Sequence, residues 1–296
     1  MSKKQVFFNG IKYVNDMSID QDLVWLEPKT PDEIIQELIT QHKKTDFYVL
    51  YSGGKDSACV AHFIAENYPE NFKGVVFTNT GISSQITRKF VIDYCKQMNW
   101  PLIMTWARKS YYDIIIDKGF PNPASHKVIM GYLKFQSWYY FLRRMKKTSA
   151  FISGVRKKES WARDKVRFYT KSPIDINATL TFAKPFLYKN GNQLQEYFIT
   201  NGLKATPAYD FFDKSGECWC GCYYNEWELK MIEKYDPFLF DTIKWLEKQV
   251  KLFGSKEAKK FPNWGRSVGA EYSKTQTTFS DFEVNEDYCG ESCMVE

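Results

Sequence analysis

Short apolar runs alternate with amphipathic segments along the first two thirds of the chain. The β-prone runs at 47–51, 74–79, 101–106 and 150–153 predict four buried strands. Helical periodicity between and after them predicts helices at 58–67, 84–98, 111–118, 131–147 and 192–201. Strands that alternate with helices are typical of βαβ units. We therefore expect an α/β fold, with a doubly wound, mostly parallel sheet that helices cover on both faces.

The two ends of the chain depart from this alternation. Residues 1–30 form a lead-in, where Asn9-Gly10 between two β-prone runs predicts a hairpin. After position 210 the chain becomes rich in turn residues and cysteines, and it then predicts two helices, at 225–234 and 237–253, before a polar tail. We expect three parts: the lead-in at 1–30, the α/β domain at 31–210, and a helical, cysteine-rich extension at 211–296.

One junction between a strand and a helix has an unusual sequence. The strand predicted at 47–51 is followed by Ser52-Gly53-Gly54-Lys55-Asp56-Ser57, here called the 52–57 loop, and then by a helix. Glycines let the backbone approach a ligand closely, and amide N–H groups beside a helix N-terminus attract anions. A Walker loop needs four residues between its glycines and a hydroxyl residue directly after its lysine, and neither is present. The sequence of this loop therefore predicts a phosphate site that is not a Walker loop.

Hydropathy and charge indicate where the protein is located and what kind of molecule it binds. No apolar run reaches about 18 residues, so we expect no membrane span, and the first residues lack an apolar leader, so a cytoplasmic location is the default expectation. The net charge is +6. Residues 127–171 alone hold 13 lysines and arginines against Glu159 and Asp164. This basic block predicts an anionic partner, either a polyphosphate nucleotide or a nucleic acid.

Five of the seven cysteines lie in two clusters late in the chain. In a reducing compartment such clusters indicate metal binding or catalysis and not disulfides. We expect a four-thiolate site that binds either zinc or a 4Fe-4S cluster, with ligands Cys218, Cys220, Cys289 and Cys293. Cys222 is then spare, and the three scattered histidines have no assigned role. Cys59 and Cys95 fall within predicted helices and are expected in the core.

Several segments together resemble the phosphoadenosine phosphosulfate (PAPS) reductase family of the adenine nucleotide α-hydrolase superfamily, the ATP pyrophosphatases. The 52–57 loop resembles the superfamily's SGGxDS pyrophosphate loop. Asn79-Thr80-Gly81 is similar to the family's D-T-G segment, with Asn79 where aspartate is usual. Gly154 and Arg156, with Glu159-Ser160 and Arg163, are similar to its G-x-R-x-x-E-S-x-x-R. The resemblance covers roughly residues 45–225 and implies a Rossmann-like fold of the HUP class.

The resemblance also implies site residues and cofactors. ATP, or alternatively PAPS or adenylyl sulfate, is the expected nucleotide, with Mg²⁺ as the metal ion. Lys134 resembles a basic position on the helix that faces the phosphates. The residues expected to bind the nucleotide are Ser52, Gly53, Gly54, Asp56, Ser57, Asn79, Thr80, Gly81, Gly154, Arg156 and Arg163, and those expected to act in catalysis are Lys55, Asp56 and Arg156.

Three functions stay open at this point. The first is cleavage of the α–β phosphate bond of ATP to adenylate a substrate, for sulfur transfer to a nucleic acid from a sulfur-donor protein; the basic block favours it. The second is thiol-dependent reduction of PAPS or adenylyl sulfate. The family uses a C-terminal cysteine for that reaction, and here Glu291 and Ser292 follow Cys289-Gly290 where an apolar residue and histidine are usual. The third is a metal-organised binding module without turnover. An oligomer is compatible with all three.

Overall fold

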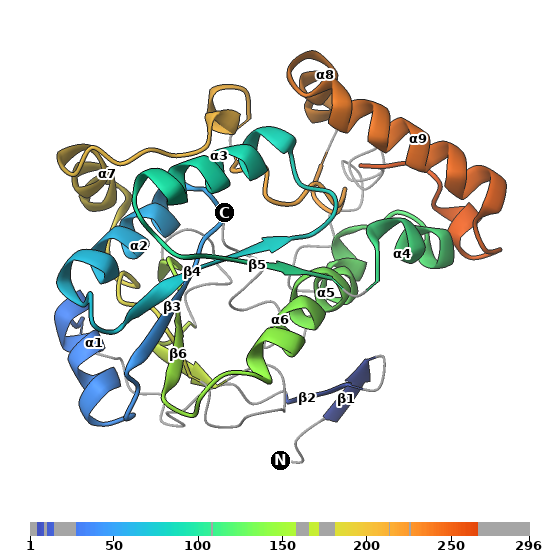
Figure 1. The fold of residues 1–296 in the computed structure, drawn as a ribbon. Helices are drawn as coiled ribbons and strands as arrows, with labels where there is room; N and C mark the ends of the chain where they lie inside the picture. The colour runs from blue at the N-terminus through green and yellow to red at the C-terminus, as the bar shows by residue number, and fades with distance from the viewer. Residues whose placement is uncertain are drawn as a thin grey trace.

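The computed structural model describes residues 5–8, 11–14, 28–107, 109–157, 166–171, 181–212, 214–224 and 226–265 (Figure 1). At its centre lies a six-stranded sheet of order β5-β4-β3-β6-β8-β7. The strands are β3 (Asp46–Leu50), β4 (Phe72–Asn79), β5 (Leu102–Trp106), β6 (Ser149–Ile152), β7 (Tyr169–Lys171) and β8 (Thr181–Ala183). All neighbouring pairs in it are parallel except β7 with β8. The predicted α/β fold is confirmed.

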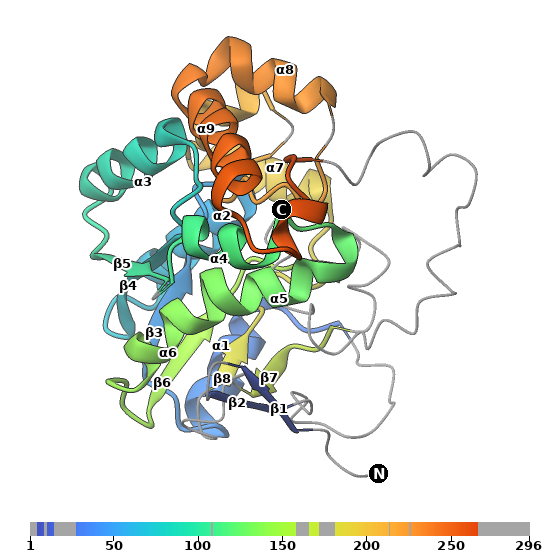
Figure 2. The same cartoon turned by 90° about the vertical axis from the view of Figure 1, so that its right-hand side faces the viewer.

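Helices cover both faces of this sheet. On one face lie α1 (Pro31–Thr40), α2 (Lys55–Asn67), α3 (Gln85–Gln97) and α7 (Gly191–Thr200). On the other lie α5 (His126–Met130), the π-helical turn η2 (Gly131–Phe135) and α6 (Gln136–Leu142), which follow one another without a break (Figure 2). The first face packs around Phe47, Val49 and Ile64, and the second around Phe151 and Trp138.

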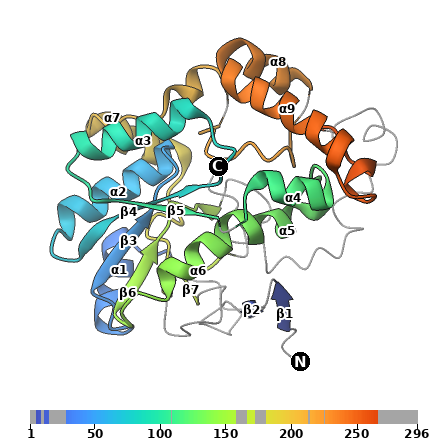
Figure 3. The ribbon, with the colours of Figure 1, turned by 45° about the vertical axis from the view of Figure 1, so that its right-hand side comes forward.

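A second hydrophobic core lies beyond the carboxyl ends of β4 and β5. It joins α4 (Tyr111–Lys118) to α8 (Glu226–Tyr235) and α9 (Pro237–Phe253), which lie beside it in Figure 3. Residues 214–224, here called the cysteine loop, contribute Trp219, which is completely buried. This core therefore combines residues from both sides of the predicted boundary at 210. That boundary, like the one at position 30, stays a prediction.

The helix after the 52–57 loop begins earlier than the apolar pattern predicts. Gly54 is its N-cap, with extended backbone, and Lys55 is its first residue. Lys55, Asp56 and Ser57 therefore form the first turn of α2 and do not belong to a preceding coil. The long helix predicted at 131–147 likewise begins at His126, passes through η2 and ends at Leu142.

The N-terminal hairpin forms from the residues that the Asn-Gly turn predicts. β1 (Gln5–Phe8) pairs antiparallel with β2 (Ile11–Val14), and Phe8 lies opposite Ile11.

None of the helices in the described ranges is long and apolar enough to cross a membrane.

The contact between α2 and α7 predicts a pH dependence of stability. His62 Nδ1 lies 2.9 Å from the Tyr197 hydroxyl, and burial lowers the pKa of His62. Below the ordinary histidine pKa of about 6.5, the unfolded chain therefore binds this proton more readily than the folded protein does. The free energy of unfolding should fall as the pH drops below that value. Urea denaturation at pH 7.5 and 5.5 checks this, and His62→Gln should reduce the difference. An unchanged difference in the variant would contradict the assignment to His62.

Candidate functional site

The 52–57 loop is held in a compact turn by its own hydroxyl groups. Gly54 N donates to Ser52 Oγ (3.2 Å), and the hydroxyls of Ser52 and Ser57 lie 3.1 Å apart. Ser57 Oγ also donates to Gly54 O and accepts from Ser52 N. Gly53 has a φ of +85°, which a side chain would disfavour, and its carbonyl accepts from Thr206 N (2.9 Å). The loop is thus preformed, at the N-terminus of a 13-residue helix.

The segment after β6 packs directly onto this loop. A Cβ on Gly154 would lie 3.0 Å from the Asp56 carbonyl carbon and 3.1 Å from Ser57 N, so only glycine fits without displacing backbone. Two residues later, Arg156 Nε donates to Asp56 Oδ2 at 2.6 Å, and each side chain is 15% exposed. This partly buried ion pair places a guanidinium beside the first turn of α2. Lys55 Nζ lies 5.3 Å from the centre of the Tyr209 ring.

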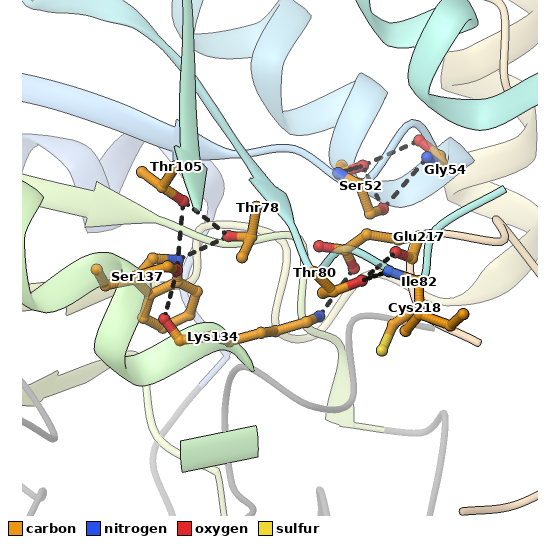
Figure 4. Close-up of polar contacts among 12 residues, drawn as sticks. Ser52, Gly54, Thr78, Thr80, Ile82, Thr105, Lys134, Ser137, Glu217 and Cys218 are labelled. Atoms are coloured by element: carbon orange, nitrogen blue, oxygen red, sulfur yellow. Dashed lines mark hydrogen bonds and ion pairs between the residues drawn. The ribbon is translucent and has the colours of Figure 1, made fainter. Parts of the chain in front are cut away.

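The end of β4 lies beside the 52–57 loop because β3 and β4 are parallel neighbours. Asn79 Oδ1 accepts from Gly81 N (3.0 Å), so its side chain closes the turn that follows the strand. Thr80 Oγ1 donates to Glu217 O (3.3 Å), and the Glu217 carboxylate accepts from Lys134 Nζ at 2.8 Å. Figure 4 shows Thr80, Lys134 and Glu217 together, with Cys218 below Ser52 and Gly54 in this view.

The Lys134–Glu217 pair is more deeply buried than the Arg156–Asp56 pair. Its side chains are 5% and 8% exposed. Lys134 comes from η2 and Glu217 from the cysteine loop, so the pair connects the helices on one face of the sheet to the second core. Here the basic position that the family resemblance points to is neutralised by a carboxylate of the chain itself.

Two cysteines of the cysteine loop and a histidine of α5 form a group of side chains that could hold a metal ion. His126, Cys220 and Cys222 are all buried, and their ligand atoms lie within 4.8 Å of one another. The Cys218 thiol is hydrogen-bonded to the Cys220 thiol, and this bond, together with burial, raises the pKa of Cys218. Burial raises the pKa of Cys59 and Cys95 to about 12, and both lie in the core as expected.

The structure gathers most of the predicted nucleotide-site residues at one end of the sheet. It places Gly154 and Arg156 against the 52–57 loop, with Asn79, Thr80 and Gly81 at the end of the next strand. Arg163, Cys289 and Cys293 lie outside the described residues, as does part of the basic block. The functional roles of all these residues stay predictions.

Two residues that the fold brings to the site, His126 and Glu217, were not predicted from the sequence. Isolated histidines and glutamates have no spacing signal, and only the fold brings these two beside Cys220 and Lys134. For Glu217, its position directly before a cysteine cluster was the one hint available.

Comparison with known proteins identifies the family. The model of the phosphoadenosine phosphosulfate reductase domain matches residues 46–220. No curated protein matches the chain. One similar solved structure is a PAPS reductase from Candida auris in a phosphate complex, with 14% identity, 66% of this chain and 93% of that chain covered, and a TM-score of 0.46. Another is the U34-tRNA thiolase NcsA from Methanococcus maripaludis with its 4Fe-4S cluster, with 15% identity, 83% and 86% covered, and a TM-score of 0.42.

The close approach of Gly154 generates a paired prediction. Gly154→Ala should lower the free energy of unfolding by about 1–3 kcal/mol, because the new methyl group meets backbone that cannot turn away. Gly191→Ala is the matched control: its Cβ would meet nothing within 4 Å, and alanine is the better helix former at the start of α7. Denaturant unfolding of both variants measures the contrast. Equal stability of the two variants would contradict the packing described here.

Proposed function

The chain belongs to the phosphoadenosine phosphosulfate reductase domain family, whose model spans residues 46–220, and we propose that it is an enzyme that binds an adenine nucleotide at the 52–57 loop. The observation that carries this proposal is the preformed loop at the N-terminus of α2, with Arg156 held against it by Asp56. Amide groups at a helix N-terminus and a fixed guanidinium are both suited to phosphate oxygens.

The segments that follow β3, β4 and β6 would each contact a different part of the nucleotide. The loop after β3 provides amide and hydroxyl groups for the phosphates, and the turn after β4, at Thr80 and Gly81, lies where the nucleoside can approach backbone. The segment after β6 supplies Arg156, whose guanidinium donates to Asp56 and has the charge and planar geometry that suit phosphate oxygens. Mg²⁺ would be held by Asp56 together with the nucleotide phosphates, and it would neutralise charge on the phosphate chain.

The family favours PAPS or adenylyl sulfate as the substrate. In that reaction a thiolate attacks the sulfonyl sulfur and the sulfur–oxygen bond to the nucleotide breaks. A second thiol then releases sulfite and forms a disulfide. Of the late cysteines, Cys220 and Cys222 lie buried beside His126, and Cys218 belongs to the same loop. We therefore assign the two thiols of this reaction to Cys289 and Cys293.

ATP cleavage is the second candidate, and the electrostatics of the chain favour it. The basic block at 127–171 suits a nucleic-acid substrate. A substrate oxygen would attack the α-phosphorus of ATP and displace pyrophosphate, and Arg156 would stabilise the developing negative charge. A sulfur nucleophile, supplied by a donor protein, would then displace AMP. This reaction needs no redox-active cysteine in the chain.

Removing Arg156 should weaken nucleotide binding. A charge-assisted hydrogen bond contributes about 1.5–3 kcal/mol, so Arg156→Ala should raise the dissociation constant for ATP or PAPS by roughly 10- to 100-fold. Lys89→Ala is the matched control, because it also removes one positive charge, from an exposed pair with Asp93 on α3. Isothermal titration calorimetry measures both variants, after thermal denaturation has shown that each is folded. Equal affinities in the two variants would remove Arg156 from the site.

The products distinguish the two reactions. With PAPS or adenylyl sulfate and a dithiol reductant, the first candidate releases sulfite, and the double variant Cys289→Ser/Cys293→Ser should abolish that release. With ATP and Mg²⁺, the second candidate releases pyrophosphate, and the same variant should leave it unchanged. Asp56→Asn should reduce either activity. Tight nucleotide binding without either product would instead identify a binding module.

A further inference from the structure

The buried group of His126, Cys220 and Cys222 lies outside the nucleotide site and has the composition of a metal centre. One imidazole and two thiols converge so that their ligand atoms all lie within 4.8 Å of one another. All three residues are buried. Thiolate and imidazole are the ligands that zinc prefers in proteins. Neither His126 nor Cys222 was part of the ligand set expected from the cysteine spacing.

Both sides of this group are fixed by the surrounding fold. His126 begins α5, follows a 3₁₀ turn capped by Asn122, and packs edge-on against the Tyr223 ring at 4.8 Å. Gly221 separates the two cysteines with a φ of +84°, and a Cβ there would lie 2.9 Å from the Trp264 ring. The Cys220 carbonyl accepts from Tyr111 Oη at 2.7 Å. The three ligand positions are therefore set by packing that is independent of any ion.

We propose that His126, Cys220 and Cys222 bind a single zinc ion, with Cys218 as the fourth ligand. Cys218 lies two residues before Cys220 on the same loop, outside the group of three whose ligand atoms lie within 4.8 Å of one another. Zinc–sulfur bonds are about 2.3 Å long and zinc–nitrogen bonds about 2.0 Å, so ligand atoms around one ion lie less than roughly 4.6 Å apart. The three ligand atoms all lie within 4.8 Å of one another, so small side-chain shifts would place them around one ion. A 4Fe-4S cluster spreads its thiolates over different iron atoms, which requires wider spacing.

The ion would fasten the cysteine loop to α5 beside the nucleotide site. Within this loop, Glu217 accepts from Thr80 and from Lys134, and Trp219 N donates to the Ile82 carbonyl at 2.9 Å. Zinc at Cys220 would therefore hold in place the part of the cysteine loop that contacts Thr80. Zinc binding itself does not depend on the nucleotide chemistry, so its test is separate from that of the proposed function.

Metal analysis of the full-length protein, purified without added metal, tests the proposal. We expect about one zinc per chain in the wild type and in the control Cys95→Ser, which removes a buried helical thiol elsewhere. Cys222→Ser and His126→Asn should each retain less than about a fifth of that zinc. The double variant Cys289→Ser/Cys293→Ser should retain all of it. Zinc lost only from the double variant, or iron with visible absorbance in place of zinc, would overturn the proposal.

A second measurement uses the wild type and avoids variants that fail to fold. The protein is alkylated with iodoacetamide before and after zinc removal by a chelator, and the modified cysteines are identified by mass spectrometry. Zinc should protect Cys218, Cys220 and Cys222, and the chelator should expose them, with a lower thermal midpoint of unfolding. Protection that is unchanged by chelator, in a protein that contains no zinc, would refute the site.

Discussion

The ion pair between Arg156 and Asp56 holds together the parts of the chain on which the proposed nucleotide site depends. It joins the segment after β6 to the first turn of α2, over a backbone contact that only Gly154 permits. Partly buried pairs of this kind gain little net stability, since desolvation offsets much of the Coulomb attraction. The pair instead fixes position. It sets where a guanidinium stands relative to the loop amides, and that placement is what phosphate recognition requires.

The second buried pair, Lys134–Glu217, extends this constraint to the other side of the site. It connects η2 to the cysteine loop, and the Glu217 carbonyl receives the Thr80 hydroxyl. A movement of the cysteine loop would therefore break this buried ion pair, at a cost of about 3–5 kcal/mol if the lysine stayed buried. The proposed nucleotide site and the second core are therefore connected through the cysteine loop.

Local patterns in the sequence predicted the bounds of several helices. The helix expected at 111–118 is α4 (Tyr111–Lys118), and the one at 237–253 is α9 (Pro237–Phe253), because each has a clear apolar stripe and terminal signals. β7 and β8 were missed because three residues give no usable periodicity. The site divides in the same way. The 52–57 loop is contiguous and was found, whereas Lys134 and Glu217 are 83 residues apart and meet only through the fold.

The identity of the proposed metal ligands bears directly on which of the two proposed reactions the chain could carry out. A four-thiolate site that uses Cys289 and Cys293 would consume the two cysteines that the reductase reaction needs, and would leave ATP cleavage as the consistent activity. A site built from His126, Cys220 and Cys222 makes no demand on them. The buried geometry at residues 218–222 therefore removes an objection to sulfonucleotide reduction without requiring that reaction. The choice between sulfonucleotide reduction and adenylation of a substrate then depends on whether Cys289 and Cys293 react as thiols. The 52–57 loop could bind the nucleotide in either reaction.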